Sequence, residues 1–434
     1  MSPDQSHPAV IKDTFVAQIS STSTLEDQEC HAPPPDSGYG WAIVVACFVI
    51  NIFSVGLPAS FGVFQATYMH QEEFQGSSSL SIAFVGSLAT LGLPLFAIIS
   101  GRLADIYGPR WVSCTGAIIV SASLIAASFC TVLWQLFITQ GFLFGFGTSL
   151  SYVPILGVLP DWFKERRGLA MGIAVSGGGV GGLAIAPILS TCISHLGWRW
   201  ALRIMGISGG VFLISAAMVL RMRVPSKQSS KIDLSYFRDD KFVRLFFMAL
   251  VTSFAWFVPL FYISVYAIQY GVSKESAALL VGLMNGASGL GRVVLGYTAD
   301  KLGPVNVLLG CESVATILIL ALWPFAMTFS TMLAFVLIFG FALGGFASLV
   351  PTVVATLFGD RGNLATVTGM IITGYAGNVI GTPIAGAIID KFTTYTQNGV
   401  KVVNFIPAIM YSGTCFFVAT ALLATIRYSM RKTK

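Results

Sequence analysis

The residue with the clearest chemical potential in this 434-residue chain is an arginine inside an apolar stretch. Arg292 lies in GLGRVVLGYTADKLGP (289–304), and seven uncharged residues separate it from Asp300. A helix rises about 1.5 Å per residue, so about 12 Å of helix axis separates the two charged groups. An arginine at the centre of a membrane helix costs about 2.5–3.5 kcal/mol on insertion scales, and its planar fork matches a carboxylate. The residue is therefore either an anchor for an anionic substrate or a long side chain that reaches toward the lipid headgroups.

Other polar side chains recur at helical spacing inside apolar stretches. Asn285 and Ser288 lie seven and four positions before Arg292, so the three share one helix face. Hydrogen bonding between helices explains many such residues, but a polar cavity near the midplane also explains them. We predict that a small-molecule substrate, for which a carboxylate is one candidate, contacts Arg292, Asn285, Ser288, Asn51, Tyr262, Tyr266 and Asn378.

The composition indicates what must hold these side chains. Hydrophobic residues form 55% of the chain and charged residues only 10%, against about 25% charged in a soluble domain. Apolar runs near or above the roughly 20 residues needed to cross a bilayer recur along the chain. The expected spans are 40–68, 79–101, 111–130, 133–160, 168–190, 199–221, 242–268, 275–298, 305–326, 330–357, 366–389 and 405–427. The predicted fold class is an all-α membrane protein with twelve transmembrane helices in two six-helix bundles.

The predicted domain organisation has one long polar interruption. Residues 1–36 form a disordered cytoplasmic tail, 37–221 and 242–427 form the two bundles, 222–241 form a cytoplasmic loop, and 428–434 form a second tail. Lys and Arg gather in the loops on one side of the predicted topology, which the positive-inside rule assigns to the cytoplasm. Because these basic residues are spread over many short loops, nucleic-acid binding is excluded. We predict a multi-pass protein of the plasma membrane, with a vacuolar or other internal membrane as the alternative.

An internal repeat relates the two halves. GRLADIYGP (101–109) and GYTADKLGP (296–304) share five of nine residues at an offset of 195. Repeated halves related by an axis along the membrane normal are a transporter design. The glycines permit tight turns and the aspartates can interact with a neighbouring helix N-terminus, as parts of a cytoplasmic latch that opens and closes. The predicted gating residues are Gly101, Arg102, Asp105, Gly108, Arg110, Asp300 and Gly303.

These motifs resemble those of a known superfamily. GRLADIYGPR (101–110) resembles the loop 2–3 signature of the major facilitator superfamily, and GYTADKLGP resembles its counterpart in the second half. DSGYGW (36–41) and DWFKERRGLAMGIAVSGGGVGG (161–182) resemble motifs of the monocarboxylate transporter family, most closely of its fungal branch. The resemblance extends over all twelve spans and implies that Arg292 is the helix 8 arginine used for substrate anions.

Two positions depart from that family. Ser288 stands where the family has an acidic residue, and Ala59 follows Pro58 where the family has a lysine. A proton-coupled lactate carrier is therefore disfavoured, and a larger or less charged solute is favoured. Glu312 is a weak candidate for proton coupling, because the resemblance places its helix at the periphery and favours a structural role.

We predict a secondary transporter working by alternating access, which moves a small organic anion or a specialised metabolite across the plasma membrane; an efflux carrier is one candidate, and the sequence leaves import and export open. The alternatives are a proton-coupled monocarboxylate or vitamin uptake carrier and a nutrient sensor without transport activity. The chain lacks a GxxxxGK[ST] motif, and GGGVGG (177–182) lies in an apolar run without the strand of a dinucleotide fold. We therefore predict no enzymatic activity, no cofactor and no metal site; protein partners beyond the lipid bilayer are unknown.

Overall fold

The computed structural model describes residues 36, 38–69, 71–74, 79–223, 234–359, 363–395 and 401–432. Nearly all of them are helical, and one short antiparallel pair of strands is present. The predicted tail, apart from Asp36, and half of the predicted central loop (224–233) lie outside the described residues.

The first half of the chain contains the elements of six spans. They are α2 (Gly38–Asn51), η1 (Ile52–Gly56), α3 (Leu57–Ala59), α4 (Phe61–Tyr68), η2 (Glu72–Phe74), α5 (Ser79–Leu95), α6 (Ala97–Tyr107), α7 (Pro109–Ala127), α8 (Leu133–Leu136), η3 (Phe137–Leu143), α9 (Phe144–Trp162), α10 (Arg167–Leu196) and α11 (Trp198–Val219). The second half repeats this plan with η4 (Leu234–Arg238), α12 (Asp240–Trp256), α13 (Val258–Gln269), α14 (Lys274–Leu302), α15 (Pro304–Ile317), η5 (Leu318–Leu322), η6 (Trp323–Phe325), α16 (Phe329–Phe358), α17 (Leu364–Thr373), η8 (Gly374–Ala376), α18 (Gly377–Lys391), β1 (Thr394–Tyr395), β2 (Lys401–Val402) and α19 (Ile406–Lys432).

These elements supply up to twelve membrane spans. Eleven described stretches are long and apolar enough to cross a bilayer, and the twelfth is the pair α5 and α6, which meet at a 47° bend. Pro94 lies one residue before the end of α5, and a proline inside a helix removes a backbone hydrogen bond and kinks it. The prediction of twelve helices is confirmed.

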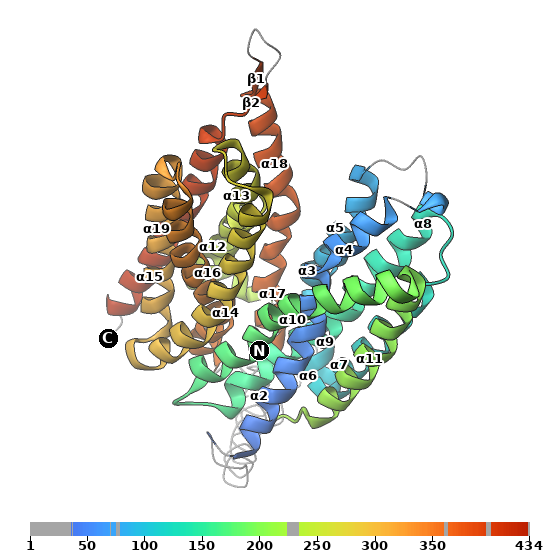
Figure 1. Ribbon diagram of the computed structural model, residues 1–434. Helices are drawn as coiled ribbons and strands as arrows, with labels where there is room; N and C mark the ends of the chain where they lie inside the picture. The colour runs from blue at the N-terminus through green and yellow to red at the C-terminus, as the bar shows by residue number, and fades with distance from the viewer. Residues whose placement is uncertain are drawn as a thin grey trace, which may run out of the picture.

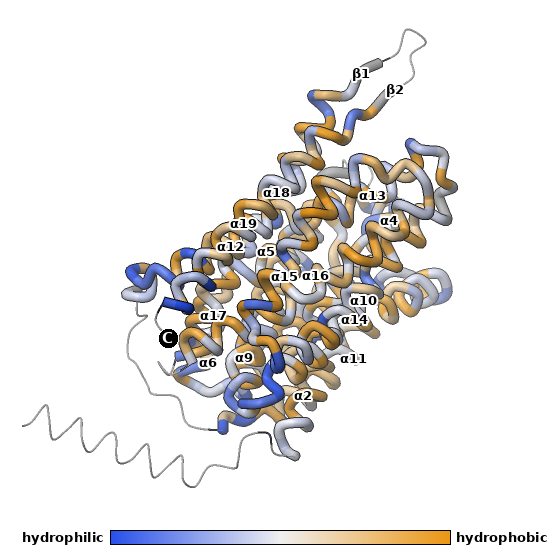
Figure 2. The backbone as a smooth tube through the Cα atoms, turned by 90° about the vertical axis from the view of Figure 1, so that its left-hand side faces the viewer, coloured by the Kyte–Doolittle hydropathy of each residue, from blue (hydrophilic) through white to orange (hydrophobic). Residues whose placement is uncertain are grey.

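The helices form two groups side by side (Figure 1), which we call the N-bundle (α2–α11) and the C-bundle (α12–α19). The N-bundle packs around one apolar core, and the C-bundle contains two. Figure 2 shows apolar residues along the helix shafts and polar residues gathered at the helix ends, chiefly near α2, α6 and the C-terminus. Apolar shafts with polar ends suit helices that cross a bilayer.

Two segments differ in extent from the sequence prediction. Part of the predicted loop 222–241 is helical, because η4 forms within it and α12 begins at Asp240. The Asp239 side chain accepts a hydrogen bond from the backbone N–H of Lys241 and so caps that helix. At the other end α19 continues to Lys432, beyond the predicted boundary at 427. Basic residues in its last turn favour this extension, because a helix C-terminus carries partial negative charge.

The bundles approach each other most closely at the end where α2 begins, which we call the latch end. Toward the end where β1 and β2 lie, the ribbons of the two bundles diverge (Figure 1). Two helix pairs make most of the contact between the bundles, α10 with α14 and α6 with α17. These pairs connect helices from opposite halves of the repeat and therefore form the interface that a transport cycle would open and close.

Candidate functional site

Arg292 lies where the two bundles meet. Its position on α14 faces α10, and its Nη1 donates a 2.8 Å hydrogen bond to the backbone carbonyl of Val175. Its Nε is buried and has no hydrogen-bond partner. The guanidinium is therefore fixed at one nitrogen while the edge that carries Nε keeps an unused donor, and a buried unpaired donor is costly unless a ligand or water satisfies it.

Two tyrosines extend this site across the interface. Tyr152, on α9 of the N-bundle, interacts electrostatically with Arg292. Tyr375, in η8 of the C-bundle, lies near Tyr152, and its hydroxyl is buried without a hydrogen-bond partner. Tyr152 could not be singled out from the sequence, because its only signal there is one hydroxyl in an apolar run.

Several other predicted substrate residues border the interface or contact helices that do. Asn51 is fully buried (0% exposed) and lies against Gly177 of α10; its Nδ2 donates to Cys47 O while its Oδ1 is unpaired. Asn378, at the start of α18, also has a buried unpaired Oδ1. Asn285 is exposed and bonds Val281 O of its own helix at 3.0 Å. These amides retain acceptors for a polar ligand.

The remaining predicted substrate residues make packing contacts within the C-bundle. Ser288 is 5% exposed, and its backbone carbonyl lies against Gly344 of α16. Tyr266 is buried in an apolar core and donates to Trp323 O at 3.1 Å. Tyr262 lies between these cases, because it is half-buried and donates to Thr382 O at 3.4 Å. The structure thus places Tyr266 in the core of the C-bundle.

The two repeated aspartates each bind a helix N-terminus of the opposite bundle. Asp300 accepts hydrogen bonds from the backbone N–H groups of Gly168 (2.6 Å) and Leu169 (2.9 Å), at the start of α10. Asp105 is buried and accepts from both the backbone N–H (2.9 Å) and the hydroxyl of Thr366, at the start of α17. The first N–H groups of a helix lack intrahelical partners and carry partial positive charge, so a carboxylate is a suitable acceptor there. We call these two contacts the latch.

Glycines near the latch let the backbones of neighbouring helices touch. A Cβ added to Gly101 would strike the backbone of Ala365, and one added to Gly172 would strike the carbonyl of Arg292. Farther along α10 a Cβ on Gly179 would lie 3.6 Å from Gly289 Cα, an ordinary contact. Glycine at the first positions therefore lets the helices approach closely at the latch end, and the separation of α10 from α14 grows away from it.

The other predicted gating residues divide into two sets. Gly108 and Gly303 have φ values of 85° and 87° and form the turns after α6 and α14, conformations that favour glycine. Arg102 interacts electrostatically with Asp105. Arg110 instead faces α11, where its guanidinium nitrogens lie 3.4 Å from Met218 Sδ. Arg110 thus contacts its own bundle and not the latch.

A third carboxylate holds the loop before α10. Asp36 accepts hydrogen bonds from the backbone N–H groups of Lys164, Glu165 and Arg166 at 3.2–3.3 Å. Asp36, the first residue of the motif DSGYGW (36–41), therefore fixes the loop that precedes Gly168, the residue that binds Asp300. Both motifs, DSGYGW (36–41) and residues 161–182, are visible in the sequence, but nothing in the sequence indicates that one binds the other.

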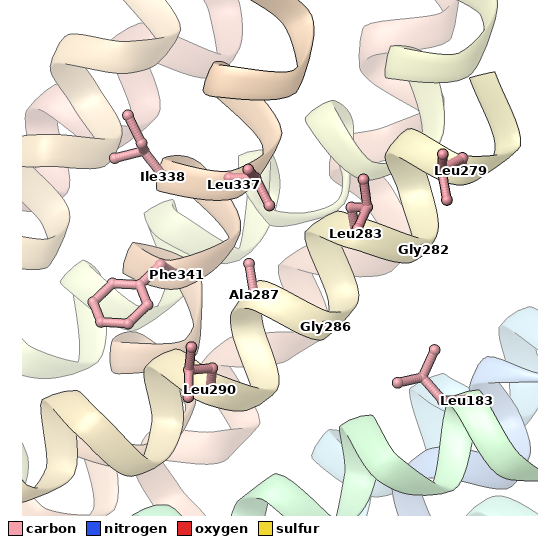
Figure 3. Close-up of a pocket in the computed structure, with 10 residues that line it drawn as sticks. All are labelled: Leu183, Leu279, Gly282, Leu283, Gly286, Ala287, Leu290, Leu337, Ile338 and Phe341. Atoms are coloured by element: carbon pink, nitrogen blue, oxygen red, sulfur yellow. The ribbon is translucent and has the colours of Figure 1, made fainter. Parts of the chain in front are cut away.

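An apolar groove of about 760 Å³ runs along α14, and its lining includes Leu290, two residues before Arg292. Figure 3 shows its lining along α14 and α16, with Leu183 of α10 on the opposite side. The groove is lined by Leu183, Leu279, Gly282, Leu283, Gly286, Ala287, Leu290, Leu337, Ile338 and Phe341. Gly282 and Gly286 have nothing within 4 Å of an added Cβ, so the space beside them is open. Sequence reasoning missed this groove because apolar residues in a membrane helix look alike whether they face lipid, protein or a cavity.

The fold and the paired latch define a class of membrane transporter, and comparison with known proteins identifies it. The Major Facilitator Superfamily matches residues 39–382, and the chain belongs to this superfamily. It is similar to the MFS-type transporter pynF of Aspergillus niger, with 30% identity over 436 residues, 98% of this chain and 99% of that protein. It is also similar to the aspyridones efflux protein apdF of Emericella nidulans, with 30% identity over 368 residues, 84% of this chain and 75% of that protein.

Solved structures agree on the fold. The E. coli fucose:proton symporter FucP gives a TM-score of 0.68 at 15% identity, covering 90% of this chain and 99% of that chain. A bacterial homologue of the iron transporter ferroportin in an outward-facing state gives 0.67 at 14% identity, covering 90% and 100%. At these identities the likeness establishes the major facilitator fold alone. The protein is thus a multi-pass membrane transporter and not an enzyme.

Proposed function

We propose that this transporter exports an amphipathic organic anion, of the size of a specialised fungal metabolite, from the cytoplasm. The single observation that carries the proposal is the unpaired Nε edge of Arg292 at the bundle interface, on the same helix, α14, that lines the apolar groove. A carboxylate would bind the guanidinium through charge-assisted hydrogen bonds, while the groove would take the apolar body of the solute. The similarity to apdF, which is named an efflux protein, supports export as the direction of transport.

The proposed orientation places the latch end in the cytoplasm, together with both chain termini, in the plasma membrane. The excess of Lys and Arg in the loops at this end supports it. In this orientation the latch closes the cytoplasmic side, and the described conformation faces outward. The resemblance of DSGYGW and of residues 161–182 to monocarboxylate transporters supports an anionic solute, whereas Ser288 and Ala59 distinguish the chain from a lactate carrier.

The test first identifies the transported solute and then measures how Arg292 variants bind and transport it. Cells with and without the protein are compared for metabolites lost to the medium, and each candidate is then tested for thermal stabilisation of the purified transporter and for flux in vesicles. Arg292→Ala should abolish flux and ligand-induced stabilisation, and Arg292→Lys should lose most of both, because a flexible point charge cannot reproduce the planar fork.

Thr298→Ala serves as the matched control, since Thr298 is on the same helix, is not among the predicted substrate residues and bonds the Val294 carbonyl of its own helix. Its effect should be much smaller than that of the arginine variants. If the ligand stabilises Arg292→Ala as strongly as the parent, Arg292 is not the anchor. If both arginine variants lose folded protein, the bond to Val175 is the main role of the residue.

A further inference from the structure

The C-bundle buries a carboxyl group that the proposed substrate site does not use. Glu312 lies on α15 and is 1% exposed. Its Oε1 accepts one long hydrogen bond, 3.4 Å from the Thr252 hydroxyl on α12, and its Oε2 is buried without a partner. A buried ionised carboxylate needs a cation or several donors to replace its lost hydration, and a single distant hydroxyl does not provide them.

Among the described residues, the elements packed around Glu312 bring no cation into contact with its carboxyl group. On α15 itself the neighbouring ionisable group is Cys311, and α16 contains no ionisable residue. From α19, the Thr420 hydroxyl bonds that of Thr316, one helical turn after Glu312, and Arg427 lies seven residues, about 10 Å, farther along α19. The charged residues of α12 are confined to its first turns: Asp240, Lys241 and Arg244.

The remaining neighbours connect Glu312 to the bundle interface. Tyr375 lies near both Glu312 and Tyr152. Tyr152 in turn interacts with Arg292 of α14, the cation at the interface. Tyr375 packs against the cores of both bundles, and its hydroxyl is buried without a hydrogen-bond partner. A phenol can both donate and accept, so an unpaired hydroxyl between a carboxyl group and a polar site is suited to pass a proton.

We propose that Glu312 is the site that binds the coupling proton of this transporter, and that Tyr375 connects it to the interface between the bundles. The inference rests on the proposed function, in which a solute is driven outward. In the described conformation Oε2 carries a proton and Glu312 is a neutral acid. When the bundles rearrange, Tyr152 and Tyr375 separate, because they belong to opposite bundles, and the proton leaves the carboxyl group toward the other side. One proton then moves inward for each cycle that moves solute outward.

The first test needs no substrate. The full-length transporter in lipid nanodiscs is titrated with acid and base while infrared spectra record the C=O band of protonated carboxyl groups. Glu312→Gln, which has the same shape, should remove one band that the parent shows, whereas Asp105→Asn should remove a different one. Tyr375→Phe should keep the Glu312 band but slow its response to a pH jump about tenfold or more. If the Glu312→Gln and parent spectra change identically with pH, the proposal is wrong.

The second test asks whether the proton controls conformation. Spin labels at Ser194 and Ala278, at the ends of α10 and α14 remote from the latch, report the distance between the bundles in a cysteine-free background. In the parent this distance should change with pH, and in Glu312→Gln it should remain at the low-pH value. A Glu312→Gln variant that follows pH as the parent does would overturn the proposal.

Arg292→Ala separates this inference from the proposed function. It should abolish anion flux while leaving the Glu312 band in the infrared spectrum. Loss of that band in folded Arg292→Ala would contradict independent proton binding at Glu312, whatever the solute is.

Discussion

Replacing Asp300 by asparagine tests the latch most directly. The Asp300 carboxylate makes two short hydrogen bonds, 2.6 and 2.9 Å, to backbone N–H groups at the start of α10. Asparagine has the same shape but only one acceptor oxygen and no charge. One bond therefore persists in weaker form, while the second is lost together with the favourable interaction with the helix N-terminus.

The expected size of the effect follows from that difference. A hydrogen bond to a charged group contributes about 1.5–3 kcal/mol. Because each 1.4 kcal/mol is tenfold in an equilibrium constant, Asp300→Asn should shift the population away from the closed latch by roughly 10- to 150-fold. The bonds form only when the bundles meet, so folding of each bundle should be unaffected.

The assay is the distance between spin labels at Ser194 and Ala278, together with solute flux in vesicles. Asp300→Asn should populate the conformation in which these ends approach, and Asp105→Asn should act in the same direction through Thr366. Glu165→Gln is the control, because Glu165 is an exposed carboxylate in the loop before α10. If the distances in folded Asp300→Asn equal those of the parent, the aspartate shapes a turn and does not hold the latch.

Three further predictions concern other features. Gly172→Val should prevent latch closure, since its side chain would strike the Arg292 carbonyl and overpacking costs about 1–3 kcal/mol; Gly182→Val, which meets only an ordinary contact, is the control in the same distance measurement. Gly286→Leu should fill the apolar groove and reduce flux of an apolar anion about tenfold, near 1.4 kcal/mol, without loss of folded protein; unchanged flux would exclude the groove from the solute path. Protease tags at residue 230 and at the C-terminus should be cut only after cells are permeabilised, and cleavage in intact cells would reverse the proposed orientation.

The sequence predicted those features that depend on local pattern. Apolar length gave twelve spans, and the repeat of Asp105 and Asp300 indicated paired gating positions. Contact with a helix N-terminus was expected for these aspartates, but which helix was beyond prediction, because the partners are chiefly backbone N–H groups more than a hundred residues away. Tyr266 shows that a polar residue at helical spacing can be predicted wrongly as a cavity residue. A hydroxyl at helical spacing predicts a polar face, but whether it meets a cavity or a carbonyl such as Trp323 O depends on how the neighbouring helix packs.

The changing separation of α10 and α14 has a mechanical consequence. The two helices contain 30 and 29 residues, so each is about 45 Å long. They touch through backbone at the latch end and reach ordinary contact at Gly179 and Gly289, near mid-length. If α10 and α14 rotate against each other as rigid bodies, the pivot lies at this mid-length contact, near the membrane centre. Separation of the two helices at one end then brings them together at the other end. Both ends are therefore not open at once, so the stiffness of the two helices prevents a continuous leak of solute without any signal between separate gates.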